Sequence, residues 1–224
     1  LQTLEKEIQN LIGDIYPYRF FGNPPLKKGM FWDLNFSYNR LFKNAKAECL
    51  VSLQDWIWIP PDGLQKFWDN YQATNGKAVI SGVGDQFAKL DEFGKPCIKI
   101  WSDPRKRSDL GSFYEVNFPD IEWNWCLLSR KAIFDVGGMC EELDYTGFGM
   151  DGYQVNERLN ALGYKFFLDQ TNESFTLRHG REDYGGEERW GRNNNLKNGR
   201  YEEIRKRFID KDEWPRMKYL TLDR

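Results

Sequence analysis

Residues 136–179 carry an ordered run of glycines, an acid, an arginine and a histidine, and this run is where the chain could do chemistry. The pairs Gly137 with Gly138 and Gly147 with Gly149 allow positive φ, or close approach of a ligand, where a side chain would obstruct it. Asp151 follows at once. The next apolar residues recur at helical spacing: Val155, Leu159 and Leu162. We therefore expect Asp151 at a loop-to-helix junction facing a cleft, where a carboxylate can accept a proton.

Another acid, Asp55, stands where the apolar segment 49–53 ends. That segment is typical of a strand, and an amphipathic helix precedes it, with Leu41, Phe42 and Ala45 on one face. Ligands of open α/β sheets bind at the carboxyl ends of strands, so Asp55 is a candidate binding residue. The alternative is that Asp55 is a turn residue or helix cap.

Taken together, these segments resemble the family 2 glycosyltransferases over residues 39–179. The C-terminal half of that family carries a glycine pair and acids, then G-x-G followed by two acids, R-L, G-Y and a histidine. The matching residues in this chain are Gly137, Gly138, Glu141 or Glu142, Gly147, Gly149, Asp151, Arg158, Leu159, Gly163, Tyr164 and His179. Order and spacing carry the resemblance, because G-x-G alone is a weak signal.

The resemblance implies an α/β fold of the GT-A nucleotide-diphospho-sugar transferase type, with a central mixed, mostly parallel sheet flanked by helices. The family's Asp-x-Asp element, which binds a divalent metal on the donor diphosphate, falls here at Gln54, Asp55 and Trp56. Mn²⁺ or Mg²⁺ held by Asp55 and His179 would act as a Lewis acid on the leaving group. Gln54 and Trp56 are implied donor contacts, as is Asn39, which matches a recurrent family asparagine.

Asp151 is the implied catalytic base, which takes the proton of the acceptor hydroxyl. A single base acting in direct displacement implies inversion at the anomeric carbon. The chain departs from the family at Gly152, where a second acid is usual, and by keeping one acid in the Asp-x-Asp position. A retaining transferase and a catalytically inactive carbohydrate-binding module of the same fold therefore stay open, and Asp151 can also be a plain N-cap.

Aromatic residues give a further hypothesis, since the chain has 9 Trp among 224 residues and sugars stack on flat rings. Segment 121–134 alternates like a strand and places Trp123 and Trp125 on one face. In the resembling family this strand lies beside the acceptor cleft, so both are candidate acceptor-binding residues. Packing in the core is the commoner fate of tryptophan.

A length of 224 residues suits a single domain spanning residues 1–224. The resembling fold opens with a strand-helix-strand unit of roughly 30 residues that cradles the nucleotide base, and a full unit does not fit ahead of Asn39. We expect that part of this unit is missing or abbreviated.

A net charge of −2 with intermixed acids and bases argues against nucleic acid as a partner. No apolar run reaches the roughly 20 residues of a membrane span, so a soluble, cytoplasmic protein is expected.

The predicted function is metal-dependent transfer of a sugar, of the hexosyltransferase type, from a nucleotide-sugar donor to a hydroxyl of a glycan or glycosylated polymer. A uridine diphosphate (UDP) sugar is the expected donor.

Residues 78–83 predict a strand, followed up to residue 117 by an irregular insertion. Residues 181–195 predict a lid over the donor.

Overall fold

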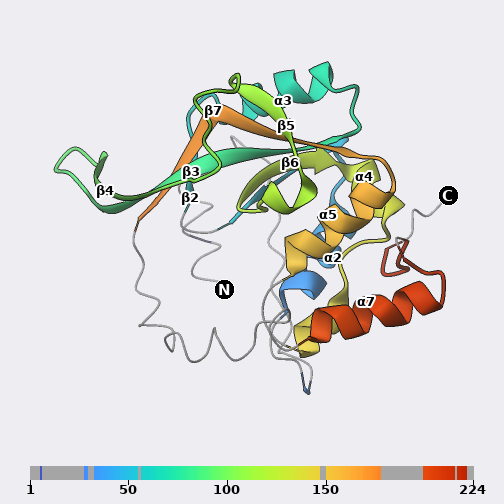
Figure 1. Cartoon of the computed structure of the whole chain (residues 1–224). Helices are drawn as coiled ribbons and strands as arrows, with labels where there is room; N and C mark the ends of the chain where they lie inside the picture. The colour runs from blue at the N-terminus through green and yellow to red at the C-terminus, as the bar shows by residue number, and fades with distance from the viewer. Residues whose placement is uncertain are drawn as a thin grey trace.

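The computed structural model describes residues 6, 28–29, 33–54, 57–146, 150–177, 199–214 and 216–220, with only the backbone of Asp151. The helices are α2 (Leu34–Asn44), α3 (Gly63–Ala73), α4 (Arg130–Asp135), α5 (Asp151–Ala161) and α7 (Arg200–Asp210), with 3-10 turns η1 (Phe118–Asp120) and η2 (Glu141–Tyr145). The strands are β1 (Cys49–Leu53), β2 (Ile57–Trp58), β3 (Ala78–Leu90), β4 (Pro96–Ser102), β5 (Phe113–Val116), β6 (Trp125–Ser129) and β7 (Lys165–Leu177). Figure 1 shows them arranged as one sheet with helices on both sides.

The strands form one seven-stranded sheet in the order β1-β6-β3-β7-β2, with β4 paired to β3 and β5 paired to β7. The predicted α/β class with a mixed sheet is confirmed. The expectation of a mostly parallel sheet is wrong, because only β3 and β7 pair in parallel among the described strands. Strand β6 runs between β1 and β3 and opposes both, and β4 returns along β3 through a short turn, which only antiparallel neighbours allow.

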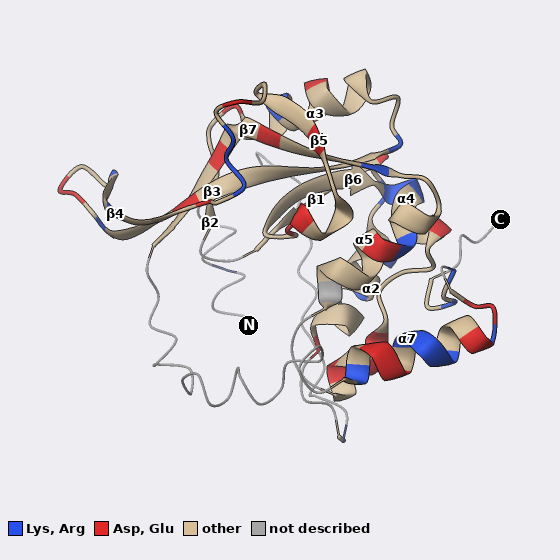
Figure 2. Ribbon diagram, in the orientation of Figure 1, with Lys and Arg blue, Asp and Glu red and all other residues tan. Residues whose placement is uncertain are grey.

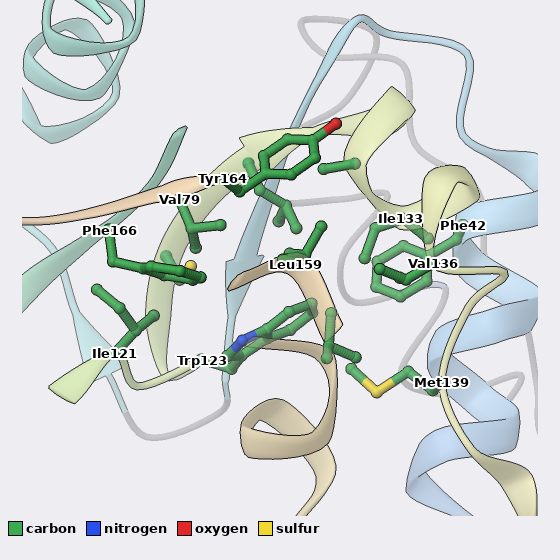
Figure 3. Packing of buried hydrophobic residues seen from close by; sticks show 14 of the residues in the cluster. Phe42, Val79, Ile121, Trp123, Ile133, Val136, Met139, Leu159, Tyr164 and Phe166 are labelled. Atoms are coloured by element: carbon green, nitrogen blue, oxygen red, sulfur yellow. The ribbon is translucent and has the colours of Figure 1, made fainter. Parts of the chain in front are cut away.

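Alternating side chains of the central strands fill two hydrophobic clusters, one on each face of the sheet. One cluster receives Val79, Cys126, Leu128, Phe166 and Leu168 from the sheet and packs against α2, α4 and α5 (Figure 3). The other receives Ala78, Ile80, Trp125 and Leu127 and packs against Phe67 and Tyr71 of α3. Successive side chains of a strand point to opposite faces, so the same strands supply both clusters. Helices cover both faces of the sheet (Figure 1).

A third cluster joins α7 to the turn η2. Cys140 and Leu143 pack there with Tyr201 and Ile204 of α7 and with Met217.

In the part of the chain that the structure describes, no helix is long and apolar enough to cross a membrane.

The irregular insertion expected after residue 83 is instead the β3–β4 hairpin followed by β5. Buried charges hold the base of the hairpin: Lys106 Nζ lies 2.7 Å from Asp85 Oδ1, and Arg105 Nε donates to Asp103 Oδ1 at 2.8 Å. Burial opposes ionisation of Asp85, but side-chain hydrogen bonds, among them those from Lys106 and Lys99, and the charge of Lys106 outweigh it and hold its pKa below the usual range. The polar residues in this region therefore pair with one another rather than form loose loops.

Candidate functional site

Strands β1, β3 and β7 run in the same direction in the sheet. Strand β3 is parallel to β7, and β1 and β3 both oppose β6, so the carboxyl ends of β1, β3 and β7 face one way. After β1, the chain crosses to the end of β7, where β2 pairs Ile57 with Thr176 and Trp58 with Phe175. This is the kind of edge at which α/β sheets bind ligands.

The predicted metal ligands flank this edge in sequence. Asp55 precedes Ile57 by two residues, and His179 follows Thr176 by three. Asp55, Trp56 and His179 lie outside the described residues. However, β2 begins shortly after Asp55 and β7 ends shortly before His179, and these two strands pair with each other.

Next to this edge, Trp58 is 40% exposed and its ring stacks on Phe175, with centroids 5.3 Å apart and an angle of 4°. Gln54, the predicted donor contact at the end of β1, donates its backbone N–H to Asn124 O at 3.0 Å. The polypeptide is therefore held on both sides of the undescribed Asp55.

Asn39 joins α2 to the segment after the glycine pair. Its Oδ1 accepts from Met139 N at 2.7 Å, and its Nδ2 donates to Met139 O and to Glu141 Oε1, each at 2.9 Å. The side chain is buried, and both its oxygen and its nitrogen form hydrogen bonds within the protein. Of the two acids that could match the family pattern, Glu141 is the one that contacts Asn39.

The glycine pair has positive φ, as predicted, with values of 72° at Gly137 and 86° at Gly138. The close approach at these positions comes from the chain itself. A Cβ on Gly137 would lie 1.3 Å from Met217 O, and one on Gly138 would lie 2.6 Å from Asn39 Oδ1. The segment at Met217 is also bonded to this loop, because Met217 N donates to Val136 O at 3.0 Å.

Arg158, another residue of the family resemblance, binds the backbone of this loop from inside the fold. Its guanidinium is fully buried and donates to Val136 O and Gly138 O, both at 2.7 Å, and through Nε to Gln154 O at 2.9 Å. Burial lowers the pKa of Arg158 to about 10, which leaves it charged at neutral pH. The arginine thus holds the backbone of the glycine pair in place from inside the fold.

Asp144, in η2, is a buried residue that sequence reasoning missed. Its carboxylate accepts from Asn35 N at 3.1 Å, Asn35 Nδ2 at 2.8 Å and Phe36 N at 2.9 Å. The two backbone N–H groups belong to the first turn of α2, whose own N-cap, Asp33, makes no side-chain cap bond. Burial raises the pKa of Asp144 to about 6. Asp144 is 109 residues from Asn35, so no local pattern indicates the pair.

Asp151 is the first residue of α5, so the predicted loop-to-helix junction is confirmed. Its side chain lies outside the described part of the structure, as do Gly147 and Gly149. At Gly152, where the resembling family has a second acid, an added Cβ would lie 2.4 Å from Cδ1 of Trp123. The indole therefore occupies the space that a second acid would need.

Trp123 and Trp125 are 4% and 2% exposed, which matches the packing alternative. Trp123 donates to Asn156 Oδ1 at 3.0 Å, and Trp125 donates to Asn172 Oδ1 at 3.1 Å. They belong to different clusters on opposite faces of the sheet. The expectation that they share one face is wrong, because β6 begins only at Trp125 and the strand alternation does not reach Trp123.

Within the described residues, no group of three or more His, Cys, Asp or Glu side chains could hold a metal ion. The predicted ligands Asp55 and His179 fall outside the residues searched. The predicted lid at 181–195 also lies outside the described residues.

No protein family and no curated protein matches this sequence. Among solved structures, the fold is similar to the crystal structure of GalNAc-T7 with UDP, GalNAc and Mn²⁺, with a TM-score of 0.58 and 12% identity. The similarity covers 80% of this chain and 35% of that longer one. At this identity the similarity concerns the fold alone: the α/β architecture of this chain is similar to that of GalNAc-T7.

Proposed function

We propose that this chain is a glycosyltransferase domain, spanning residues 1–224, that moves a sugar from a UDP-sugar to a hydroxyl of a glycan or glycosylated polymer. The pairing of β2 with β7 carries the proposal, because it joins the chain ends that lead to Asp55 and His179. The similar fold of GalNAc-T7 was crystallised with UDP, GalNAc and Mn²⁺, the ligand classes that this edge is proposed to take.

Asp55 and His179 would hold the metal. One carboxylate and one imidazole, carried by chain ends that meet at one strand pair, suit a Mn²⁺ or Mg²⁺ that also binds diphosphate oxygens. When bound, such an ion neutralises charge on the leaving diphosphate. Gln54 and Trp56 flank Asp55 and are proposed donor contacts. Asn39 is proposed to act on the donor site as a positioning residue, through its bonds to Met139 and Glu141.

Asp151 is the proposed base. The acceptor oxygen bonds to the anomeric carbon as the bond from that carbon to the diphosphate breaks, and the bonding electrons leave with the nucleoside diphosphate. Asp151 takes the hydroxyl proton during this step. Trp123 supports Asp151 by packing on Gly152 rather than by touching the acceptor. With one base, inversion is expected, and analysis of the product anomer distinguishes it from retention.

Release of UDP from a panel of UDP-sugars in the presence of Mn²⁺ tests the proposal. We expect metal-dependent release that falls about 10²-fold or more in Asp55→Ala, His179→Ala and Asp151→Asn. Asp109→Ala is the matched control, because Asp109 is an exposed acid paired with Arg107 at 2.8 Å and such pairs contribute little. Equal release by Asp55→Ala and Asp109→Ala would contradict the proposed site.

Two observations favour a second candidate, an inactive carbohydrate-binding module of the same fold. The space for a second acid beside Asp151 is filled by Trp123, and the Asp-x-Asp position keeps one acid. Sugar binding without UDP release from any donor would support this candidate.

A further inference from the structure

A cleft of ≈330 Å³ opens between η2 and the first two turns of α7. Helix α7 lies away from β2 in the fold (Figure 1). The walls of the cleft come from two elements that are far apart in sequence. The lining residues are Glu142, Tyr145 and Thr146 on one side, and Arg200, Glu203, Ile204 and Arg207 on the other.

Both walls of the cleft are fixed to the scaffold of the proposed active site. On α7, Tyr201 donates to Glu157 Oε2 at 2.5 Å and Arg205 Nε donates to Glu157 Oε1 at 2.8 Å, which ties α7 to α5. On η2, Asp144 is bonded to the start of α2. Helix α5 begins at Asp151, so the helix that starts with the proposed base also anchors one wall of the cleft.

The charges that line the cleft are balanced. Arg200 Nη1 lies 2.6 Å from Glu203 Oε2, and Arg207 pairs with Glu142. Figure 2 shows the same mixture of acidic and basic positions along α7. A phosphate would meet the two glutamates, and a cation would meet the two arginines, so this lining disfavours a strongly charged ligand.

The lining is instead suited to a neutral ligand with many hydroxyl groups. Carboxylates accept hydrogen bonds and guanidinium groups donate them, and both are planar, so each can bind two neighbouring hydroxyls. Tyr145 is 45% exposed and offers an aromatic surface, while Ile204, 7% exposed, forms an apolar floor. An apolar surface bordered by a few polar groups is typical of small-molecule sites.

We propose that this cleft binds a neutral sugar residue, a hexose or N-acetylhexosamine, of the acceptor glycan. The sugar ring packs on Tyr145 and its hydroxyls bond to the Glu142–Arg207 and Arg200–Glu203 pairs. The assignment to the acceptor rests on the proposed function, whereas sugar binding itself does not. Thr146 precedes Asp151 by five residues, which connects the cleft to the proposed base through a short stretch of chain.

Binding is measured by calorimetry or ligand-observed NMR with the full chain, without donor or metal. The probes are the methyl glycosides of glucose, galactose and N-acetylgalactosamine, and glucuronate as a charged comparison. We expect at least one neutral glycoside to bind with a Kd on the order of 1 mM. Tyr145→Ala should weaken it at least about fivefold through loss of the ring. Phe93→Ala is the matched control, because Phe93 is 77% exposed at the turn of the β3–β4 hairpin.

A second variant tests the charge argument. Glu142→Gln removes one acid and leaves Arg207 with an unpaired charge. The affinity for glucuronate, relative to that for the neutral glycoside, should therefore rise at least about threefold. An unchanged thermal midpoint shows that each variant is folded.

The proposal is overturned if no neutral glycoside binds, if Tyr145→Ala and Phe93→Ala bind it equally, or if the wild-type chain prefers glucuronate. UDP release without glycoside binding would overturn the cleft assignment and leave the proposed function standing. Glycoside binding that depends on Tyr145, without UDP release, would support the cleft and contradict the transferase.

Discussion

The loop at Gly137 and Gly138 and the edge between β2 and β7 both involve residues of the family resemblance, yet they differ in what they touch. The loop is closed by its own chain: Arg158 binds its carbonyls, and Met217 approaches Gly137. At the edge, Trp58 is 40% exposed and the strands lead to Asp55 and His179. One part of the resemblance therefore builds the scaffold, and another part supplies the residues proposed for chemistry.

The largest effect is expected from Gly137→Ala, because its Cβ would lie 1.3 Å from Met217 O. The clash is with backbone, so we expect a loss of more than about 4 kcal/mol in the free energy of unfolding. Gly94→Ala is the control: φ is 74° and nothing lies within 4 Å, so only strain of about 1–2 kcal/mol remains. Urea denaturation measures both. Equal losses would show that the Met217 segment does not close the loop.

Arg158→Met removes the donors that hold Val136 O and Gly138 O. Gly138 O then loses this donor while Val136 O keeps Met217 N, and with the loss of the buried guanidinium's hydrogen bonds the change should cost about 3–4 kcal/mol. Arg107→Met, at an exposed pair with Asp109, should cost less than about 0.5 kcal/mol. Chemical denaturation compares them, and a loss below about 1 kcal/mol in Arg158→Met would contradict the scaffold role.

Gly152→Ala should cost about 1–3 kcal/mol, because the new Cβ meets the ring of Trp123 at 2.4 Å. A smaller ring relieves this clash, so Gly152→Ala combined with Trp123→Phe should cost less than the sum of the single changes. Unfolding free energies of the two single variants and the double variant test this coupling. Additive losses would mean that Trp123 does not fill the space beside Asp151.

The smallest effect is a pH dependence at Asp144, whose pKa rises from 3.8 to about 6 on folding because of burial. A raised pKa favours the protonated form, so the stability that Asp144 contributes is present below its unfolded pKa and is lost as pH rises through about 6. Relative to Asp144→Asn, the wild-type chain should lose about 1–2 kcal/mol between pH 4.5 and 7.5. The opposite slope would show that the N–H donors of α2 favour the carboxylate more than burial opposes it.

Local patterns predicted much of the fold. Apolar spacing indicated the helix that begins at Asp151 and the strand after it, because those patterns depend on neighbouring residues. The same reasoning failed where partners are distant. Strand β3 continues to Leu90 because β4 and β7 pair with it, and Asp144 caps a helix 109 residues away. In the candidate site, the order of motif residues was predictable, but the internal use of Asn39 and the burial of Trp123 depend on packing that spacing does not encode.

Calorimetric titration of UDP in the presence and absence of Mn²⁺ tests the central claim most directly. The account predicts Mn²⁺-dependent binding to the wild-type chain and to Asp109→Ala, at least about tenfold weaker binding to Asp55→Ala and His179→Ala, and unchanged unfolding free energies in all of them. Absence of UDP binding to the wild-type chain, or equal binding by Asp55→Ala, would contradict the assignment of chemistry to the β2–β7 edge.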